Sequence, residues 1–110
     1  MIGVDMRNTV LLDSFLKIVE GFSDTDMTFL LSEVVLTYMG VNGSNGVIQW
    51  VAETLQNCIL TVYEQINPYD PFGQVMCSHF RKLGSPLKCI AKYPYENHQV
   101  ERYRSAVIIL

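Results

Sequence analysis

The chain has 110 residues, of which 49% are hydrophobic and 17% charged, and its formal net charge is −3. No apolar run reaches the roughly 18 residues that a membrane span needs, and the amino terminus has neither the basic region nor the apolar core of a signal peptide, so we expect an intracellular, cytoplasmic protein. The three cysteines are odd in number and form no C-x-x-C pair, which favours reduced thiols over a disulfide framework. A composition this rich in core residues is typical of part of a larger domain.

Three short apolar runs are each followed directly by an acidic residue. The runs are Ile2–Val4, Met27–Ser32 and Cys58–Tyr63, and the acids are Asp5, Glu33 and Glu64. Their spacing suits strands joined by crossover helices, which predicts an α/β fold with a parallel, doubly wound sheet. The unbroken apolar runs predict strands that are covered on both faces. The acids would then meet at the carboxyl edge of the sheet, where such folds bind ligands. Carboxylates there favour a ligand with hydroxyl, amine or ammonium groups, such as a nucleoside, although acids at strand ends also simply solvate loops.

Helical periodicity fills the segments between and after these strands. The first helix is predicted over Asn8–Glu20 and stops at Gly21, which is a C-cap residue. The glycines and asparagines from 40 to 46 predict a break, and a second helix follows from about Ser44 or Gly46 to Gln56. A third runs from the N-cap Asp70 to Gly84, and a fourth covers about Asn97–Arg104. The expected core face of the third helix consists of Phe72, Val75, Met76, Phe80 and Leu83.

Two features of the second half allow both a functional and a structural interpretation. His79 lies near Cys77, but two candidate metal ligands without a third are poor support for a metal site, and a packed or hydrogen-bonded histidine is favoured. Residues 67–110 also hold six basic groups against three acids, interleaved with aromatic residues. The basic residues are Arg81, Lys82, Lys88, Lys92, Arg102 and Arg104. Such a mixture is found in RNA-binding surfaces, but the excess is far below that of a typical basic patch, so the charge alone favours a solvated helix face over buried aromatics.

The sequence contains no nucleophile-and-base arrangement, no P-loop and no glycine-rich dinucleotide fingerprint. Covalent catalysis is therefore not supported, and we assign no catalytic side chain. Methyl transfer from a sulfonium donor fits this absence, because the displacement requires mainly proximity and alignment.

Three ordered motifs carry a family resemblance. They are Glu-Val-Val-Leu-Thr-Tyr-Met at 33–39, Tyr-Glu-Gln at 63–65 and Asp-Pro-Phe-Gly-Gln-Val-Met at 70–76, and Gly-Val-Asp-Met-Arg at 3–7 adds to them. Together they resemble the signatures of the leucine carboxyl methyltransferase family. Residues 79–87 are similar to the branch that completes wybutosine, the hypermodified guanosine beside the anticodon of phenylalanine tRNA.

The resemblance implies a Rossmann-like, class I methyltransferase fold that uses S-adenosylmethionine and no metal. It implies that Asp5 and the backbone of Met6 hold the adenine of the cofactor and that Glu33 lies in the cofactor pocket. Tyr38, Glu64 and Gln65 are expected to face the substrate, although a structural role in tying the strand end to the next helix is equally open for Glu64, Gln65 and Gln74.

The resemblance also implies that residues 1–110 are a partial methyltransferase domain. The family's glycine-rich loop corresponds to a position before Met1, and the segment from Ser105 to Leu110 departs from the family pattern, so we expect a fragment that is inactive alone. The implied acceptor is phenylalanine tRNA. The alternative acceptor is the C-terminal leucine carboxylate of a protein phosphatase catalytic subunit, and the alternative of another class is a non-catalytic interaction protein.

Overall fold

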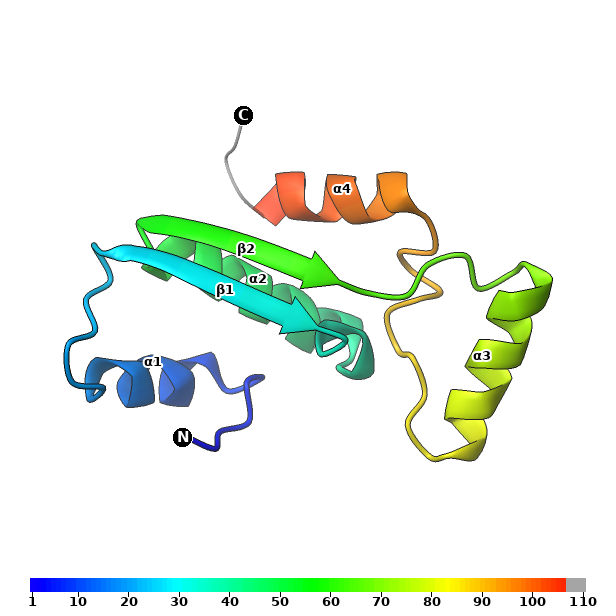
Figure 1. Ribbon diagram of the computed structural model, residues 1–110, viewed down its shortest axis with the longest axis horizontal. Helices are drawn as coiled ribbons and strands as arrows, with labels where there is room; N and C mark the ends of the chain where they lie inside the picture. Colours follow the sequence, from blue (N-terminus) through cyan, green and yellow to red (C-terminus); the bar gives the residue numbers. More distant parts are fainter. Residues whose placement is uncertain (107–110) are drawn as a thin grey trace.

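The computed structural model describes residues 1–106, so residues 107–110 of the segment that departs from the family pattern lie outside the described residues. The fold belongs to the α/β class (Figure 1). In chain order the elements are α1 (Thr9–Lys17), β1 (Met27–Glu33), the 3₁₀ helix η1 (Leu36–Tyr38), α2 (Val41–Thr54), β2 (Asn57–Tyr63), α3 (Pro71–Lys82) and α4 (Glu96–Ala106).

The two strands form a parallel pair, as predicted. Met27 lies opposite Asn57 and Glu33 lies opposite Tyr63, with η1 and α2 as the connection between the strands. The predicted strand at Ile2–Val4 is wrong, because these residues are coil and the described sheet has two strands. Three residues cannot hold a strand conformation without a neighbour to pair with.

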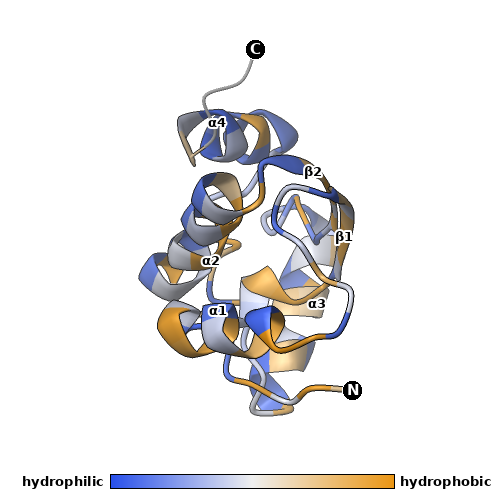
Figure 2. Ribbon diagram, turned by 90° about the vertical axis from the view of Figure 1, so that its left-hand side faces the viewer, coloured by the Kyte–Doolittle hydropathy of each residue, from blue (hydrophilic) through white to orange (hydrophobic). Residues whose placement is uncertain are grey.

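The sheet is covered on one face only within residues 1–106. Side chains alternate along both strands, and Phe29, Leu31 and Tyr63 are 64%, 64% and 68% exposed. The opposite face is partly buried, and Leu60 and Val62 line an apolar groove with residues of α2 and α4. Figure 1 shows α2 on one side of the strands, and no described helix covers the other. The prediction of strands covered on both faces is therefore wrong for the described chain. Figure 2, which looks along the strands, shows α2 on one side of them.

Helix α2 begins at Val41 with Gly40 as its N-cap residue, earlier than predicted. The expected break is wrong because Asn42, Gly43, Asn45 and Gly46 lie inside the helix. Contacts from distant parts of the chain explain this. A Cβ placed on Gly43 would come within 3.2 Å of Cγ of Arg7, and Ser44 is fully buried. Tertiary packing thus overrides the weak helix propensity of the segment.

Helices α1 and α3 show where local patterns succeed and where they fail. Asn8 caps α1, which ends at Lys17, before Gly21. Asp70 caps α3 as predicted, and its Oδ1 accepts a hydrogen bond of 2.6 Å from the backbone N–H of Gly73. The predicted core face of α3 is largely wrong. Phe72, Val75 and Leu83 are 77%, 69% and 63% exposed, whereas Met76 and Phe80 are half-buried.

The core lies between η1, α2 and the segment before α4. Its buried apolar residues are Leu36, Val47, Ile48, Val51, Leu55, Leu87, Cys89 and Ile90. The three cysteines are free thiols, in agreement with the sequence. None of the helices within residues 1–106 has the length and apolarity that a membrane span requires.

Candidate functional site

The two strands bring two of the three predicted acids to one end of the molecule. Glu33 is the last residue of β1 and is exposed, and Glu64 directly follows β2. Between Glu33 and η1 the backbone turns sharply, because Val34 has a φ of 50° and its N–H donates to the carbonyl of Tyr63 at 2.8 Å. The predicted meeting of Glu33 and Glu64 at the carboxyl ends of parallel strands is confirmed, whereas Asp5 does not follow a strand.

One carboxylate oxygen of Glu64 joins the end of β2 to η1. Its Oε1 accepts a hydrogen bond of 3.1 Å from the backbone N–H of Leu36, which is 28 residues away. Its Oε2 is buried and has no partner within the described chain. Burial raises the pKa of Glu64 above its ordinary value, while backbone N–H groups of η1 and the charge of Arg102 oppose that shift. The structural role is thus present, and the second oxygen has no partner among residues 1–106.

Gln65 follows this acid in the chain, and Tyr38 lies two residues after Leu36, whose backbone N–H donates to the acid. Oε1 of Gln65 is a second buried acceptor without a partner among the described residues. Tyr38 ends η1 and is half-buried, with its ring packed edge-on against Phe80 at a centroid distance of 6.1 Å. Gln74 instead donates to the carbonyl of Tyr69 at 2.9 Å, which is a structural contact.

Asp5 is exposed and fixed by Arg7. Its Oδ2 lies 2.6 Å from Nη2 of Arg7, and Nε and the backbone N–H of Arg7 both donate to Oδ1 at 3.0 Å. The side-chain hydrogen bond and then the backbone hydrogen bond from Arg7 lower the pKa of Asp5 to about 2. Met6 packs against the core cluster of Leu36, Val47 and Ile48. The segment that carries Asp5 therefore reaches the turn between β1 and α2.

That turn is held from two sides. Glu64 binds the backbone N–H of Leu36, and the carbonyl of Thr37 accepts from the N–H groups of Lys88 and Cys89 at 2.7 and 3.2 Å. Thr37 itself is 4% exposed. A turn fixed in this way presents the neighbouring polar groups in a constant geometry, which reduces the entropic cost of binding a ligand.

The ends of the two strands carry several hydrogen-bond acceptors. Glu33 contributes an exposed carboxylate, and Glu64 and Gln65 contribute buried oxygens without partners among the described residues. Oxygens of this kind accept hydrogen bonds from amine and hydroxyl groups. Within residues 1–106 no three His, Cys, Asp or Glu side chains are grouped as metal ligands. His79, which the sequence suggested to be packed, is exposed and contacts the ring of Phe80 at 5.7 Å.

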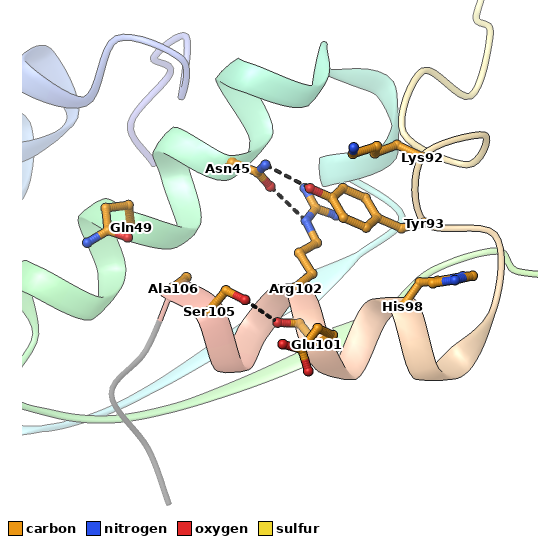
Figure 3. Close-up of a pocket in the computed structure, with 9 residues that line it drawn as sticks. All are labelled: Asn45, Gln49, Lys92, Tyr93, His98, Glu101, Arg102, Ser105 and Ala106. Carbon is orange, nitrogen blue, oxygen red and sulfur yellow. Dashed lines mark hydrogen bonds between the residues drawn. The ribbon is translucent and has the colours of Figure 1, made fainter.

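Arg102 is the residue that the sequence interpretation misplaced. The charge pattern predicts that it belongs to a solvated basic face, but it is 6% exposed and points from α4 toward α2 (Figure 3). Its Nε donates to Oδ1 of Asn45 at 2.9 Å, and Nη2 contacts Oγ of Ser44. The guanidinium carbon lies 4.4 Å from the ring centroid of Tyr93. The sequence contains a signal for this burial. Helix α4 has few apolar residues, so a polar side chain has to take part in its packing against the rest of the fold.

Comparison with known proteins gives clear relatives, although no family model matches the chain. The tRNA wybutosine-synthesizing protein 4 of Rattus norvegicus is 37% identical over 106 residues, and that of Aspergillus oryzae is 39% identical over 108 residues. Each alignment covers 96% of this chain. A leucine carboxyl methyltransferase 1 homolog of Arabidopsis thaliana is 31% identical over 97 residues, or 86% of this chain.

The predicted resemblance to the leucine carboxyl methyltransferase family is confirmed. The chain spans 15% of the length of the rat protein, 10% of the Aspergillus protein and 28% of the Arabidopsis protein. It is therefore similar to a segment of these relatives.

Proposed function

We propose that this chain forms part of a doubly wound, Rossmann-like methyltransferase domain and supplies one wall of its S-adenosylmethionine pocket. The observation that carries the proposal is the parallel pair that brings Glu33 and Glu64 to one end, in a segment similar to proteins named as methyltransferases. Open α/β sheets bind ligands at this end of their strands. Further strands and helices would cover the exposed face of the sheet.

Each candidate residue has a defined task in this proposal. The carboxylate of Asp5, kept ionised by Arg7, would accept a hydrogen bond from the exocyclic amine of the adenine. The backbone N–H of Met6 would meet a ring nitrogen, and Glu33 would accept hydrogen bonds from the cofactor. Tyr38, Gln65 and the free oxygen of Glu64 would face the acceptor.

S-adenosylmethionine supplies a methyl group bound to a positively charged sulfur. An acceptor carboxylate is already nucleophilic, so the chain needs no general base and contributes by binding and alignment. The fixed turn between β1 and α2 serves that alignment, because it sets Glu33 and Tyr38 in one geometry.

The acceptor that we propose is a wybutosine precursor on phenylalanine tRNA, methylated in the cytoplasm. Two observations support it. The relatives that align over 96% of the chain carry the wybutosine name, and Arg81, Lys82 and Lys92 are exposed near the end of α3 and in the following segment. The similarity to leucine carboxyl methyltransferases supports the second candidate, a phosphatase subunit that ends in leucine.

The test uses the protein as its gene encodes it, with any flanking residues. Methyl transfer from labelled S-adenosylmethionine is measured with hypomodified phenylalanine tRNA and, in parallel, with a phosphatase subunit ending in leucine. We expect transfer to the tRNA. Methyl transfer to the phosphatase subunit alone would show that the acceptor is a protein, and the methyltransferase activity would still stand. A folded protein that binds no S-adenosylmethionine would instead favour a non-catalytic interaction protein.

A further inference from the structure

Three aromatic rings lie in a row where α3 and α4 begin. They belong to Tyr69, Tyr95 and His98, and we call them the aromatic row. The ring centroids of Tyr69 and Tyr95 are 6.4 Å apart, and those of Tyr95 and His98 are 5.4 Å apart. Tyr69 is 59% exposed and Tyr95 is 42% exposed. Exposed aromatic rings on a folded surface are not required by the core, which points to a binding role.

The backbone around the aromatic row is fixed. The N–H of Asn67 donates to the carbonyl of Pro94 at 2.7 Å, which joins the segment before α3 to the segment before α4. The side chain of Gln99 donates to the carbonyl of Tyr93 at 3.1 Å. The backbone that carries the rings is thus held in place before any ligand arrives, which lowers the entropy lost on binding.

A cavity with a basic side chain lies at each end of the aromatic row. Tyr69 and Arg81 line a cavity of about 390 Å³ between α3 and residues 86–91. His98 lines a second cavity, of about 450 Å³, with Lys92 and Arg102 (Figure 3). Within residues 1–106 the ion pairs are Arg7 with Asp5 and Lys17 with Asp13, so the buried charge of Arg102 has no carboxylate partner there.

We propose that the aromatic row and its two flanking cavities bind single-stranded RNA, with bases stacked on Tyr69 and Tyr95 and phosphates near Arg81 and Lys92. This deepens the proposed function, on which it rests, because it names the surface that holds the loop of the tRNA acceptor. Proteins recognise unpaired bases by stacking them on aromatic side chains beside cations. A peptide ending in a carboxylate would need one cation and no row of rings.

Acidic groups near the aromatic row reduce the electrostatic attraction for RNA. Glu96 follows Tyr95, Glu101 lines the second cavity, and Asp70 follows Tyr69 with its Oδ1 occupied by the N–H of Gly73. These acids offset part of the attraction for phosphates, so stacking dominates the affinity. Two phosphate contacts predict a slope of log affinity against log salt of about −1.4, at roughly −0.7 for each contact with a single strand.

The experiment measures RNA binding by the encoded protein and its variants. Fluorescence anisotropy is recorded with a labelled single-stranded RNA of about ten nucleotides. Tyr69→Ala and Tyr95→Ala should each weaken binding by on the order of tenfold, whereas Tyr69→Phe and Tyr95→Phe keep the ring and should bind as the unchanged protein does. Phe72→Ala removes an exposed aromatic ring of α3 that is not part of the aromatic row, and it serves as the control. Circular dichroism verifies that each variant is folded.

The outcomes separate this inference from the proposed function. Alanine variants that bind RNA like the unchanged protein, or an unchanged protein that binds no RNA, would overturn the inference even if S-adenosylmethionine binds. Alanine variants that lose affinity for a leucine-terminated peptide and keep affinity for RNA would overturn it too. RNA binding that depends on the two rings, in a protein that binds no S-adenosylmethionine, would support the RNA surface and refute the methyltransferase.

Discussion

Replacing Glu64 tests how the end of β2 holds the turn after β1. In Glu64→Ala the backbone N–H of Leu36, a residue that is 3% exposed, loses its acceptor. A buried donor left without a partner costs about 1–3 kcal/mol. With a urea dependence of about 1–3 kcal/mol per molar for a small domain, the midpoint of unfolding should fall by roughly 1 M.

Glu64→Gln separates the hydrogen bond from the charge. The amide keeps an oxygen that accepts from Leu36, and it removes a carboxylate whose pKa burial raises. A carboxyl group with a raised pKa in the folded state gives its full stabilisation below its ordinary value of 4.5 and loses it as the pH rises through the raised pKa. At pH 7 the glutamine variant should therefore be at least as stable as the unchanged protein.

The assay is urea unfolding of the encoded protein between pH 4 and pH 8, followed by far-ultraviolet circular dichroism. We expect the difference in free energy of unfolding between the unchanged protein and Glu64→Gln to move in favour of the glutamine variant as the pH rises. The reasoning is refuted if Glu64→Ala unfolds at the same urea concentration as the unchanged protein. It is refuted equally if the unchanged protein gains stability over Glu64→Gln as the pH rises.

Three further predictions concern ligands and solubility. Glu33→Ala in the encoded protein should weaken S-adenosylmethionine binding by about 10- to 100-fold in calorimetric titration, the value of a charged hydrogen bond, with a smaller effect on stability because Glu33 is exposed; equal losses of affinity and stability would indicate a structural acid. The 110-residue chain alone should bind no measurable S-adenosylmethionine and should aggregate, because Phe29 and Leu31 are exposed beside open strand edges; light scattering should fall in Leu31→Lys, and micromolar cofactor binding would contradict the prediction. Charge reversal of Arg81 and Lys82 together should weaken tRNA binding and leave cofactor affinity unchanged, and unaltered tRNA binding in a filter assay would argue against the RNA acceptor.

The parallel pair could be predicted because its signals are local. Two apolar runs are followed directly by Glu33 and Glu64, and the segment between them has the length of a crossover helix. This pattern predicts two neighbouring parallel strands. The signal for the N-cap at Asp70 is equally local. The carboxylate of an aspartate accepts a hydrogen bond from a backbone N–H of the first turn, and the proline that follows it suits the first helical position. The resemblance added the residues of the site, of which Glu33 and Glu64 come together at the strand ends.

The start of α2 and the place of Arg102 could not be predicted from local patterns. Ser44 and Asn45 are helical in a segment rich in glycine and asparagine, and their side chains contact an arginine 58 and 57 residues away. A pattern of neighbouring residues cannot predict a contact between residues this far apart in the sequence. The exposed face of α3 has a related cause, because periodicity shows which side of a helix is apolar and not what covers it.

Ultraviolet cross-linking of labelled S-adenosylmethionine to the encoded protein, followed by mapping of the labelled peptides, tests the central claim most directly. The chain is proposed to form one wall of the cofactor pocket, so label should appear on peptides that contain Asp5 and Met6 or Glu33. An excess of unlabelled cofactor should remove it. Label that appears elsewhere in a folded, cofactor-binding protein and never within residues 1–106 would contradict the claim.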